Sequence, residues 1–519
     1  MQVPVEGCAV DMKRSLAICV YTNTIIAVAL GLYFFLVPAG ELVWDLRDPG
    51  LRGESIPRCA FRWHRALSPK YEEWARDRVR SGRAQSNTAD IAGTEWPLFG
   101  SVFYLWATEA LQEAAEWNPD LCPVPPNRYA RGAIEAAAAL VADPDHAGWV
   151  KQYWGDDYLE HENLFYRMLL ISALTSCQKL LGDTRYEELL RWQVGSLANE
   201  LDESPHGLLD DYPGQCYPVD IVPAIAAIRR ADSVLGTDHS QFVARAIRGF
   251  EGTRLDSHTG LPAYVVDSQR GRAEDSARGV GLSFMLTWAP QIWPQTARDW
   301  YAKYERQFWQ EGWFLAGFRE FPKDIDVGWF NMSDVDAGPI VAGYGVAASA
   351  FGVGAARAMG RTDHAYKLTT ETLVACWPLP TGTLLVPRIL SSVSDAPYLG
   401  EAATLFALTR QPIGEVQGSA GARPPLIVYL GVFALSALGI YEITASVRKL
   451  RRWRRKDPRC YVPSPQFQAL LWWILLGCAI VMPVAFNGWI ALVFLLGALI
   501  LPRQRNRPVA EAEQAPSSE

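Results

Sequence analysis

The segment ENLFYRMLLISALTSCQKLL, residues 162–181, decides the fold class predicted for this protein. Its apolar side chains recur with the period of one helix face, at Leu164, Phe165, Met168 and Leu169. Ser172 continues that face with a small side chain, and Gly182-Asp183 ends the run. The pattern predicts a helix that is buried against other helices.

Further helical segments follow this one along the chain. Pro218 suits the first turn of a helix and Gly236 its end. Four other segments continue the pattern, at 185–201, 241–250, 295–310 and 338–360. Strand-like alternation is scarce between 85 and 415, and about 330 residues suffice for six helix pairs of ordinary length. The sequence therefore predicts an all-α domain over 85–415, a closed toroid of paired helices, with an open solenoid as the alternative.

The composition excludes several classes of protein. The chain has 519 residues, of which 49% are hydrophobic and 20% charged, with a formal net charge of −7. A nucleic-acid binder that depends on overall basicity is therefore not expected. The nine cysteines include no CxxC pair, which argues against a cysteine zinc site or a thioredoxin-like centre. We expect no metal and no cofactor.

Apolar runs predict four membrane spans, at 16–36, 426–443, 467–483 and 485–501. For the first of these, a cleaved signal peptide is the alternative, but the run is long and no A-x-A site follows it. Residues 340–359 resemble a fifth span. Their many glycines and alanines, with Arg357 near the end, suit a buried helix better.

Basic residues predict the orientation of these spans. Lys and Arg crowd residues 448–459 and recur at 503–507, after the fourth span. The positive-inside rule puts both clusters in the cytoplasm, together with the tails 1–15 and 502–519. The protein is thus expected in the cell membrane, with its large domain on the extracytoplasmic side. The basic run at 448–459 binding nucleic acid is the alternative to its lying at the anionic leaflet.

Four acidic and aromatic loops each lead into an apolar helix. They occupy residues 94–100, 154–166, 207–218 and 329–339. In a helical toroid such loops converge on one rim. Helix N-termini carry partial positive charge, which stabilises carboxylates or an anionic group there. The sequence therefore predicts a functional site at this rim.

Several motifs resemble the linalool dehydratase/isomerase family. They are WGDD (154–157), ENLFY (162–166), LGDTRYEELL (181–190), HGLLDDYPGQC (206–216), LGTDHS (235–240), DVDAGPIVAGYGVAASAFGVGAARAMG (334–360) and PYLGEAATLFAL (397–408). The similarity covers residues 85–410 and none of the spans from 426 onward. It implies an (α/α)6 barrel and a cofactor-free acid–base site for allylic alcohols, with cysteines and acids around the substrate.

The resemblance carries over to some residues only. It implies that Cys216 matches the family's second active-site cysteine and that Tyr166 lies in the matching ENxxY stretch. Asp210 or Asp211 stands where the family has an acidic residue. Leu209 replaces the family's first cysteine and Leu169 its helix histidine, so much of the family's acid–base machinery is missing.

The candidate site residues combine these observations. As catalytic groups we expect Cys216, Asp210, Asp211, Glu162, Tyr166, Asp334 and Asp336. As substrate-binding residues we expect Trp154, Tyr212, Trp96 and Trp329. Carboxylates near Cys216 favour a thiol proton donor over a thiolate nucleophile. The alternatives are a buried structural cysteine and carboxylates that cap turns or helices.

Three functions fit this sequence. The first is a membrane-anchored lyase or isomerase of the hydro-lyase type, which acts by acid–base catalysis on a small hydrophobic alcohol. The second is an (α/α)6 carbohydrate-active hydrolase, lyase or epimerase of the cell envelope, with a glycan substrate. The third is a non-catalytic binding module, so whether the protein is an enzyme stays open. Expected partners are the lipid bilayer and the substrate, not nucleic acid, and homo-oligomerisation stays open.

Overall fold

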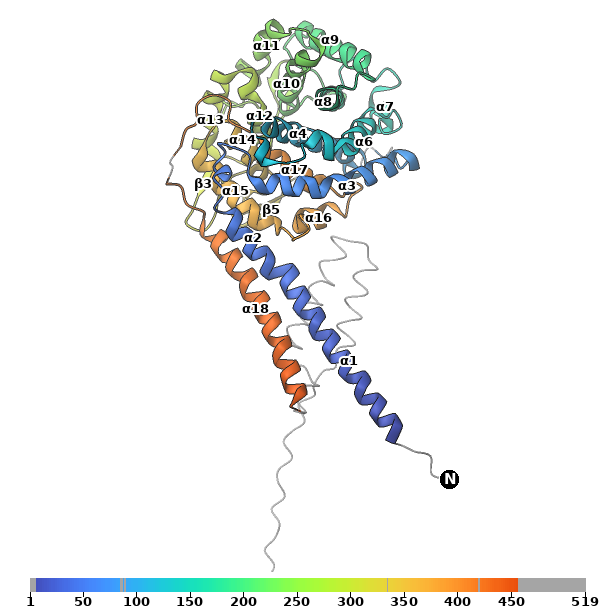
Figure 1. The fold of residues 1–519 in the computed structure, drawn as a ribbon. Coiled ribbons are helices and arrows are strands. Elements are labelled where there is room, and N and C mark those ends of the chain that lie inside the picture. Colours follow the sequence, from blue (N-terminus) through green and yellow to red (C-terminus); the bar gives the residue numbers. More distant parts are fainter. Residues whose placement is uncertain (1–5, 85–86, 88–89, 334, 419–420, 456–519) are drawn as a thin grey trace, which may run out of the picture. The chain divides into compact units, whose positions relative to one another are not determined.

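The computed structural model describes residues 6–84, 87, 90–333, 335–418 and 421–455. Most of these residues are helical (Figure 1). The chain divides into two compact units, residues 33–438 and residues 1–32 with 439–519. The expected spans 467–483 and 485–501, the tail 502–519 and Asp334 lie outside the described residues.

Six helices of the unit 33–438 contact one another in chain order, and the last contacts the first. They are α4 (Ile91–Trp117), α8 (Leu164–Leu181), α10 (Pro218–Leu235), α12 (Gly279–Ile292), α14 (Val346–Ala358) and α17 (Leu399–Thr409). Figure 1 shows these six, which we call the inner helices, in the middle of the unit.

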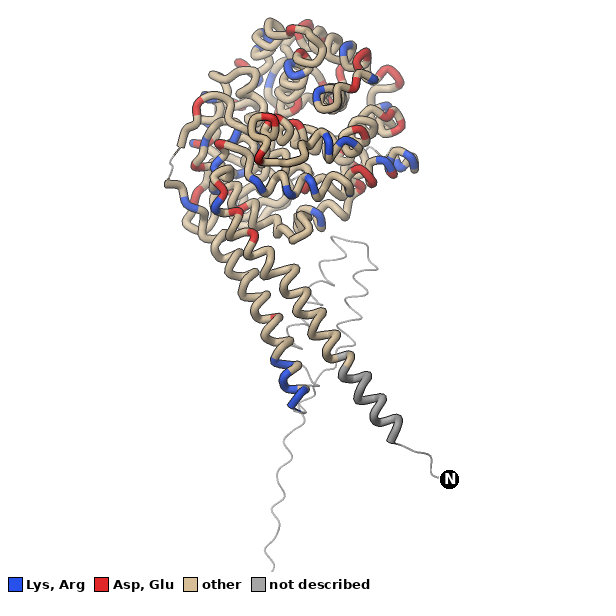
Figure 2. Tube along the Cα trace, viewed as in Figure 1, with Lys and Arg blue, Asp and Glu red and all other residues tan. Residues whose placement is uncertain are grey.

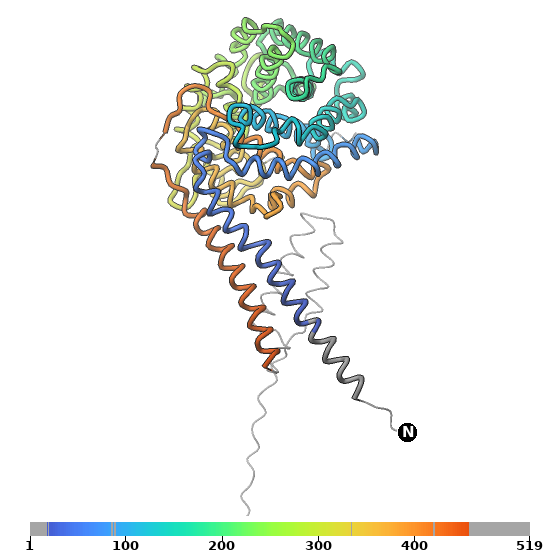
Figure 3. Tube along the Cα trace, in the orientation of Figure 1, coloured from blue at the N-terminus to red at the C-terminus, as the bar shows by residue number. Residues whose placement is uncertain are grey.

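A second set of helices alternates with the inner ones along the chain. It consists of α3 (Arg58–Ser81), α6 (Arg131–Ala142), α9 (Glu187–Glu203), α11 (Ser240–Ala246), α13 (Pro294–Phe308) and α15 (Thr362–Cys376). Each packs against at least one inner helix. Figure 3 lets the chain be followed through these helices by its colour, from blue to orange. Helix α3 precedes residue 85, where the sequence predicts the domain to start, and it contacts α6 and α17.

The inner helices run in the same direction. Near their C-terminal ends, Glu109 of α4 accepts hydrogen bonds from Ser176 of α8 and Arg230 of α10. Arg410, directly after α17, donates to the carbonyl of Trp106 in α4 at 2.8 Å. Between the two ends, aromatic rings from four inner helices contact one another, namely Phe103, Trp106, Phe284, Trp288, Phe351 and Phe406. Burial of these large rings contributes strongly to the core.

The short strands of this unit are not expected from the sequence. They are β1 (Val266–Asp267), β2 (Arg272–Ala273), β3 (Trp309–Glu311), β4 (Ala316–Phe318), β5 (Phe330–Met332), β6 (Pro339–Val341) and β7 (Tyr344–Gly345). They pair antiparallel as β1-β2, β3-β4 and β5-β6-β7. The helix expected over 338–360 therefore begins at Val346 instead. Gly338 and Gly343 both have positive φ, which interrupts a helix and suits the turns that flank β6.

The remaining elements are short. They are η2 (Pro49–Arg52), η3 (Pro119–Leu121), α5 (Pro126–Tyr129), α7 (Gly148–Trp154), η4 (Ile247–Phe250), η5 (Gly252–Arg254) and α16 (Leu385–Ser391).

Two helical stretches are long and apolar enough to cross a membrane. One is Val20–Asp45, which runs through α1 (Glu6–Gly31), the π-helical turn η1 (Leu32–Leu36) and α2 (Val37–Asp45). The other is α18 (Leu426–Arg454). Most of the surface of both apolar stretches is exposed, unlike that of a core helix. Helix α14, within the stretch 340–359, is too short to span a bilayer and is largely buried. Figure 2 shows Lys and Arg gathered at the C-terminal end of α18.

Candidate active site

A tight turn presents the acidic loop before α10. Pro213 and Gly214 are its central residues, and Gly214 has φ of 77°, as a type II turn requires. The amide of Gln215 donates to the carbonyl of Tyr212 at 2.7 Å and closes the turn. Asp210 accepts from the amide of Gly214 at 2.7 Å. Its own carbonyl accepts from the amide of Leu164 at the start of α8, so Asp210 holds the loop together.

Four carboxyl groups lie within electrostatic range of one another near the N-terminal ends of the inner helices. We call Glu95, Asp211, Asp220 and Asp336 the carboxyl cluster. Glu95 lies in α4, Asp211 in the tight loop, Asp220 in the first turn of α10 and Asp336 between β5 and β6. Residues far apart in the sequence thus meet at one place.

Burial changes the protonation of three of these groups. Desolvation raises the pKa of Glu95 from 4.5 to about 7, and Asp336 raises it further, although the hydrogen bond from Tyr212 opposes the rise. Desolvation also raises the pKa of Asp211 and Asp220 well above the usual range, and Asp220 adds to the effect on Asp211. Such carboxyls keep a proton near neutral pH and can act as general acids.

The N-terminal ends of two inner helices favour the ionised form of two of these carboxyls. Asp220 lies in the first turn of α10, and Glu95 follows the first turn of α4. Helix N-termini carry partial positive charge, which stabilises an ionised carboxylate. Of the two, Glu95, with a pKa of about 7, is the one close to the balance between its acid and base forms at neutral pH.

Three tyrosines connect the carboxyl cluster. The hydroxyl of Tyr212 donates to Glu95, and that of Tyr264 donates to Asp336 at 3.0 Å. The pKa of Tyr217 is raised to about 12, first by burial and then by all four carboxyls of the cluster, and its ring packs against that of Tyr264 at 5.7 Å. The amide of Tyr217 donates to Asp211 at 2.8 Å. The hydroxyls of Tyr212 and Tyr264 thus supply hydrogen-bond donors to the cluster.

An ion pair supports the loop that carries Asp336. Arg278 binds the buried carboxylate of Glu320 at 3.0 Å and donates to the hydroxyl of Ser333 at 2.8 Å. Its guanidinium also stacks on the ring of Tyr264. Arg278 thus connects Ser333, directly after β5, with Glu320 and with Tyr264, which donates to Asp336.

Cys216 is near the cluster but has no exposed surface. Its carbonyl accepts from the amide of Val266, which continues the pairing of β1. Burial raises the pKa of the thiol well above 9.0, and Asp211, Asp210, Asp220 and Glu162 raise it further. The raised pKa favours the thiol form over the thiolate, and the buried position of Cys216 suits packing better than contact with a substrate.

Glu162 and Tyr166 stand apart from the carboxyl cluster. Glu162 has a φ of 41°, and its amide donates to Glu200, which is paired with buried Arg167. This left-handed backbone in a non-glycine residue is strained and is stabilised by its surroundings. Tyr166 is buried, and its hydroxyl donates to the carbonyl of Val141 in α6 at 3.1 Å. The structure thus brings neither side chain into the hydrogen bonds of the cluster.

The four expected substrate-binding residues have different environments. Tyr212 belongs to the cluster, and the indole of Trp154 donates to the carbonyl of Asp211 at 3.2 Å. Trp96 is part-buried next to Glu95 in α4. Trp329 is 76% exposed, beside a shallow surface pocket that Arg319 also lines.

Sequence reasoning missed Glu95, Asp220, Tyr217 and Tyr264 as site residues. Glu95 stands in a loop that the sequence does single out, 94–100, and Asp220 follows the helix-opening Pro218 by two positions. Their positions close to the N-terminal ends of inner helices are the available signal. Tyr264 carries no comparable signal, because its place depends on the pairing of distant segments.

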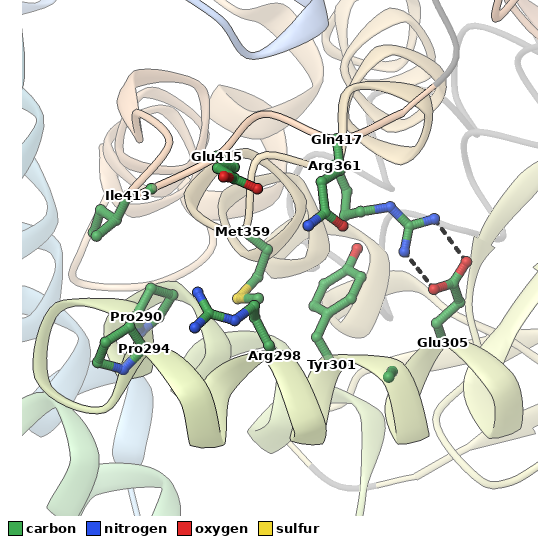
Figure 4. Close-up of a pocket in the computed structure, with 12 residues that line it drawn as sticks. Pro290, Pro294, Arg298, Tyr301, Glu305, Met359, Arg361, Ile413, Glu415 and Gln417 are labelled. Atoms are coloured by element: carbon green, nitrogen blue, oxygen red, sulfur yellow. Dashed lines mark hydrogen bonds and ion pairs between the residues drawn. The ribbon is translucent and has the colours of Figure 1, made fainter.

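A cavity of about 540 Å³ lies elsewhere, between α13 and the segment 413–417 (Figure 4). Figure 4 shows Arg361 of this cavity paired with Glu305, and Arg298 pointing toward Met359. None of its lining residues belongs to the carboxyl cluster or to the candidate residues from the sequence. Within the described part of the chain, no group of three or more His, Cys, Asp or Glu is arranged to hold a metal ion.

Comparison of the chain with protein-family models gives no match, and comparison with curated proteins gives none. The family resemblance therefore remains a hypothesis, and the function has to be argued from the site itself.

Proposed function

We propose that this protein is a membrane-anchored (α/α)6 barrel enzyme of the linalool dehydratase/isomerase type. The alternation of inner and outer helices, with the last inner helix against the first, supports the closed toroid. The motifs between 154 and 408 support the family. The proposed reaction is acid–base elimination or isomerisation of a small hydrophobic alcohol without a cofactor.

The carboxyl cluster is the observation that carries this proposal. Loss of water from an alcohol needs a proton donor for the hydroxyl and a base for the adjacent carbon. Asp220 suits the donor, because its raised pKa keeps the proton near neutral pH. Glu95 suits the base, because its pKa of about 7 leaves an ionised fraction there.

The proposed elimination of water needs neither an oxidant nor a reductant. Asp220 gives its proton to the substrate hydroxyl, and the carbon–oxygen bond breaks with both electrons leaving on water. Asp336, which interacts electrostatically with Glu95 and Asp220, stabilises the allylic cation that forms. Glu95 then removes a proton from the adjacent carbon, and that bond pair becomes the new double bond. Tyr212, which is bonded to Glu95, orients this carboxylate.

The proposed orientation follows from the basic end of α18. Lys and Arg between 448 and 455 suit the cytoplasmic side of a span that begins at Leu426. The part of the unit between the two candidate spans, residues 46–425, then lies on the extracytoplasmic side. Together with the sequence-based spans at 467–483 and 485–501, this makes the protein multi-pass.

Turnover of allylic terpenoid alcohols such as linalool by the purified full-length protein tests the function. We expect Asp220→Asn and Glu95→Gln each to lower kcat by about 10²–10⁴-fold, the usual worth of a general acid or base. Asp238→Asn, at an exposed aspartate after the end of α10, is the matched control and should leave kcat unchanged. Wild-type rates in both cluster variants would overturn the assignment.

Cys216→Ala separates the proposed mechanism from one that uses the family's cysteine. Because the thiol is fully buried, we expect this variant to melt at a lower temperature. The specific activity of its folded fraction should stay near wild type. A normal melting temperature with lost activity would assign the acid–base role to Cys216 instead.

A second function is supported by the hairpin that carries Asp336. Trp329 and Phe330 are largely exposed on the same hairpin. Exposed rings beside carboxyls suit stacking of sugars, and a pair of carboxyls also serves glycoside hydrolysis. Release of sugars from envelope glycans, lost in Asp220→Asn, would favour this carbohydrate-active enzyme. A protein that binds either ligand but turns over neither would be a binding module.

A further inference from the structure

The loop between β3 and β4 presents two aromatic side chains at the start of α18. Trp313 is 79% exposed, and Phe314 is also exposed. The amide of Leu426 donates to the carbonyl of Trp313 at 3.3 Å, and that of Ile427 to Phe314 at 3.1 Å. The tip of this hairpin is therefore bonded to the first turn of the candidate span. Its four residues, Gly312 to Leu315, include no charged side chain.

Helix α16 exposes apolar side chains, whereas its one cationic side chain, Arg388, points into the protein. Leu390 is 66% exposed, Ile389 is exposed as well, and so is Val393, two residues after the helix ends. Arg388 instead pairs with the buried carboxylate of Glu401 and stacks on the ring of Tyr398. A helix surface in water has the opposite polarity. This inverted arrangement is typical of a surface that faces lipid.

The C-terminal end of α15 connects these two regions. Glu371 accepts from the amide of Ala316, next to the hairpin tip, at 2.8 Å. Val374 lies against Gly431 of α18. Trp377 donates to the carbonyl of Phe34, where η1 leads into α2, and its own carbonyl accepts from Leu385 of α16. Figure 1 shows α16, α2 and the start of α18 at the same edge of the unit 33–438.

We propose that Trp313, Phe314, Ile389, Leu390 and Val393, here called the apolar edge, dock the unit 33–438 onto the lipid bilayer. Tryptophan prefers the boundary between headgroups and acyl chains, and Trp313 lies at the level where the apolar run of α18 begins. Exposed apolar patches in water are otherwise unfavourable. Docking holds the unit against the membrane in one orientation, beyond the tether that two spans provide. This inference rests on the membrane-spanning part of the proposed function.

Fluorescent labels on single introduced cysteines test the apolar edge. The full-length protein is first changed by Cys8→Ser, Cys19→Ser, Cys460→Ser and Cys478→Ser, and the five described cysteines, which are buried, are kept. Trp313→Cys and Leu390→Cys are labelled with an NBD dye, and the protein is reconstituted in phosphatidylcholine vesicles. Trp192→Cys, on exposed α9 at the opposite edge in Figure 1, is the aqueous control. Phe433→Cys is the control for the span, because it lies about 10 Å along α18 from Leu426.

We expect nitroxide-labelled lipid to quench the dyes at 313, 390 and 433, and aqueous iodide to quench the dye at 192 only. If iodide quenches the dyes at 313 and 390 as it does the dye at 192, while the lipid label quenches the dye at 433, the apolar edge is refuted and the span stands. If iodide quenches the dye at 433 as well, the span and the apolar edge are both refuted. Catalysis at the carboxyl cluster is measured separately and does not depend on either result.

Discussion

Glu95 couples protonation to stability because its carboxyl is buried among other acids. Its pKa of about 7 in the folded protein compares with 4.5 for the free side chain. The unfolded chain therefore loses its proton first as the pH rises. On this account the contribution of Glu95 to stability is fully present below pH 4.5 and is lost as the pH rises through 7.

Glu95→Gln tests this linkage, because glutamine has the same shape and can still accept the hydrogen bond from Tyr212. Between about pH 4.5 and pH 8, the free energy of unfolding of the wild type should fall relative to that of the variant by up to about 3 kcal/mol. Melting temperatures of both proteins in detergent across this range measure the difference. A constant difference would contradict the raised pKa.

At the scale of elements, the start of α12 depends on a close approach that only glycine allows. The amide of Gly279 donates to the carbonyl of Glu320 at 2.8 Å. A Cβ at this position would stand 2.0 Å from the carbonyl oxygen of Arg319. Arg278 and Glu320, the next residues along each segment, form the ion pair that supports the loop with Asp336. The position of α12 and that of this loop therefore depend on each other.

Gly279→Ala should therefore destabilise the protein by about 1–3 kcal/mol, the usual cost of overpacking. Gly195→Ala is the matched control, because nothing lies within 4 Å of the added Cβ on α9. In the control, alanine should raise the stability by about 0.5–1 kcal/mol, since it loses less backbone entropy in a helix. Thermal unfolding followed by circular dichroism distinguishes the two variants. Equal melting temperatures would mean that the segment around Arg319 moves without cost.

At the scale of the whole molecule, the topology determines which compartment the carboxyl cluster faces. The proposed orientation predicts that reporter fusions after residue 410 are exported and that fusions after residue 455 are cytoplasmic. The physical reason is the positive-inside preference of the Lys and Arg between 448 and 455. Alkaline phosphatase and green fluorescent protein fusions report the two compartments. The opposite pair of results would overturn the orientation.

The sequence by itself determined the helical character of this protein. The segment 162–181 gives helix α8 almost in full, and Pro218 and Gly236 mark the two ends of α10. The tight turn at Pro213-Gly214 is also local, as is the apolar length of α18. Such features are readable because helix hydrogen bonds, side-chain period and turn geometry depend on residues close in the chain.

Only the tertiary structure decided which residues form the candidate site. Tyr212 and Glu95 are 117 residues apart, and their hydrogen bond exists because α4 and the loop before α10 reach the same end of the inner helices. The raised pKa of Asp220 and the burial of Cys216 likewise depend on the segments that surround them. The pairing of β5, β6 and β7 is decided in the same way. A local pattern identifies an acid or a thiol, but desolvation and neighbouring charges, which come from distant residues, determine its chemistry.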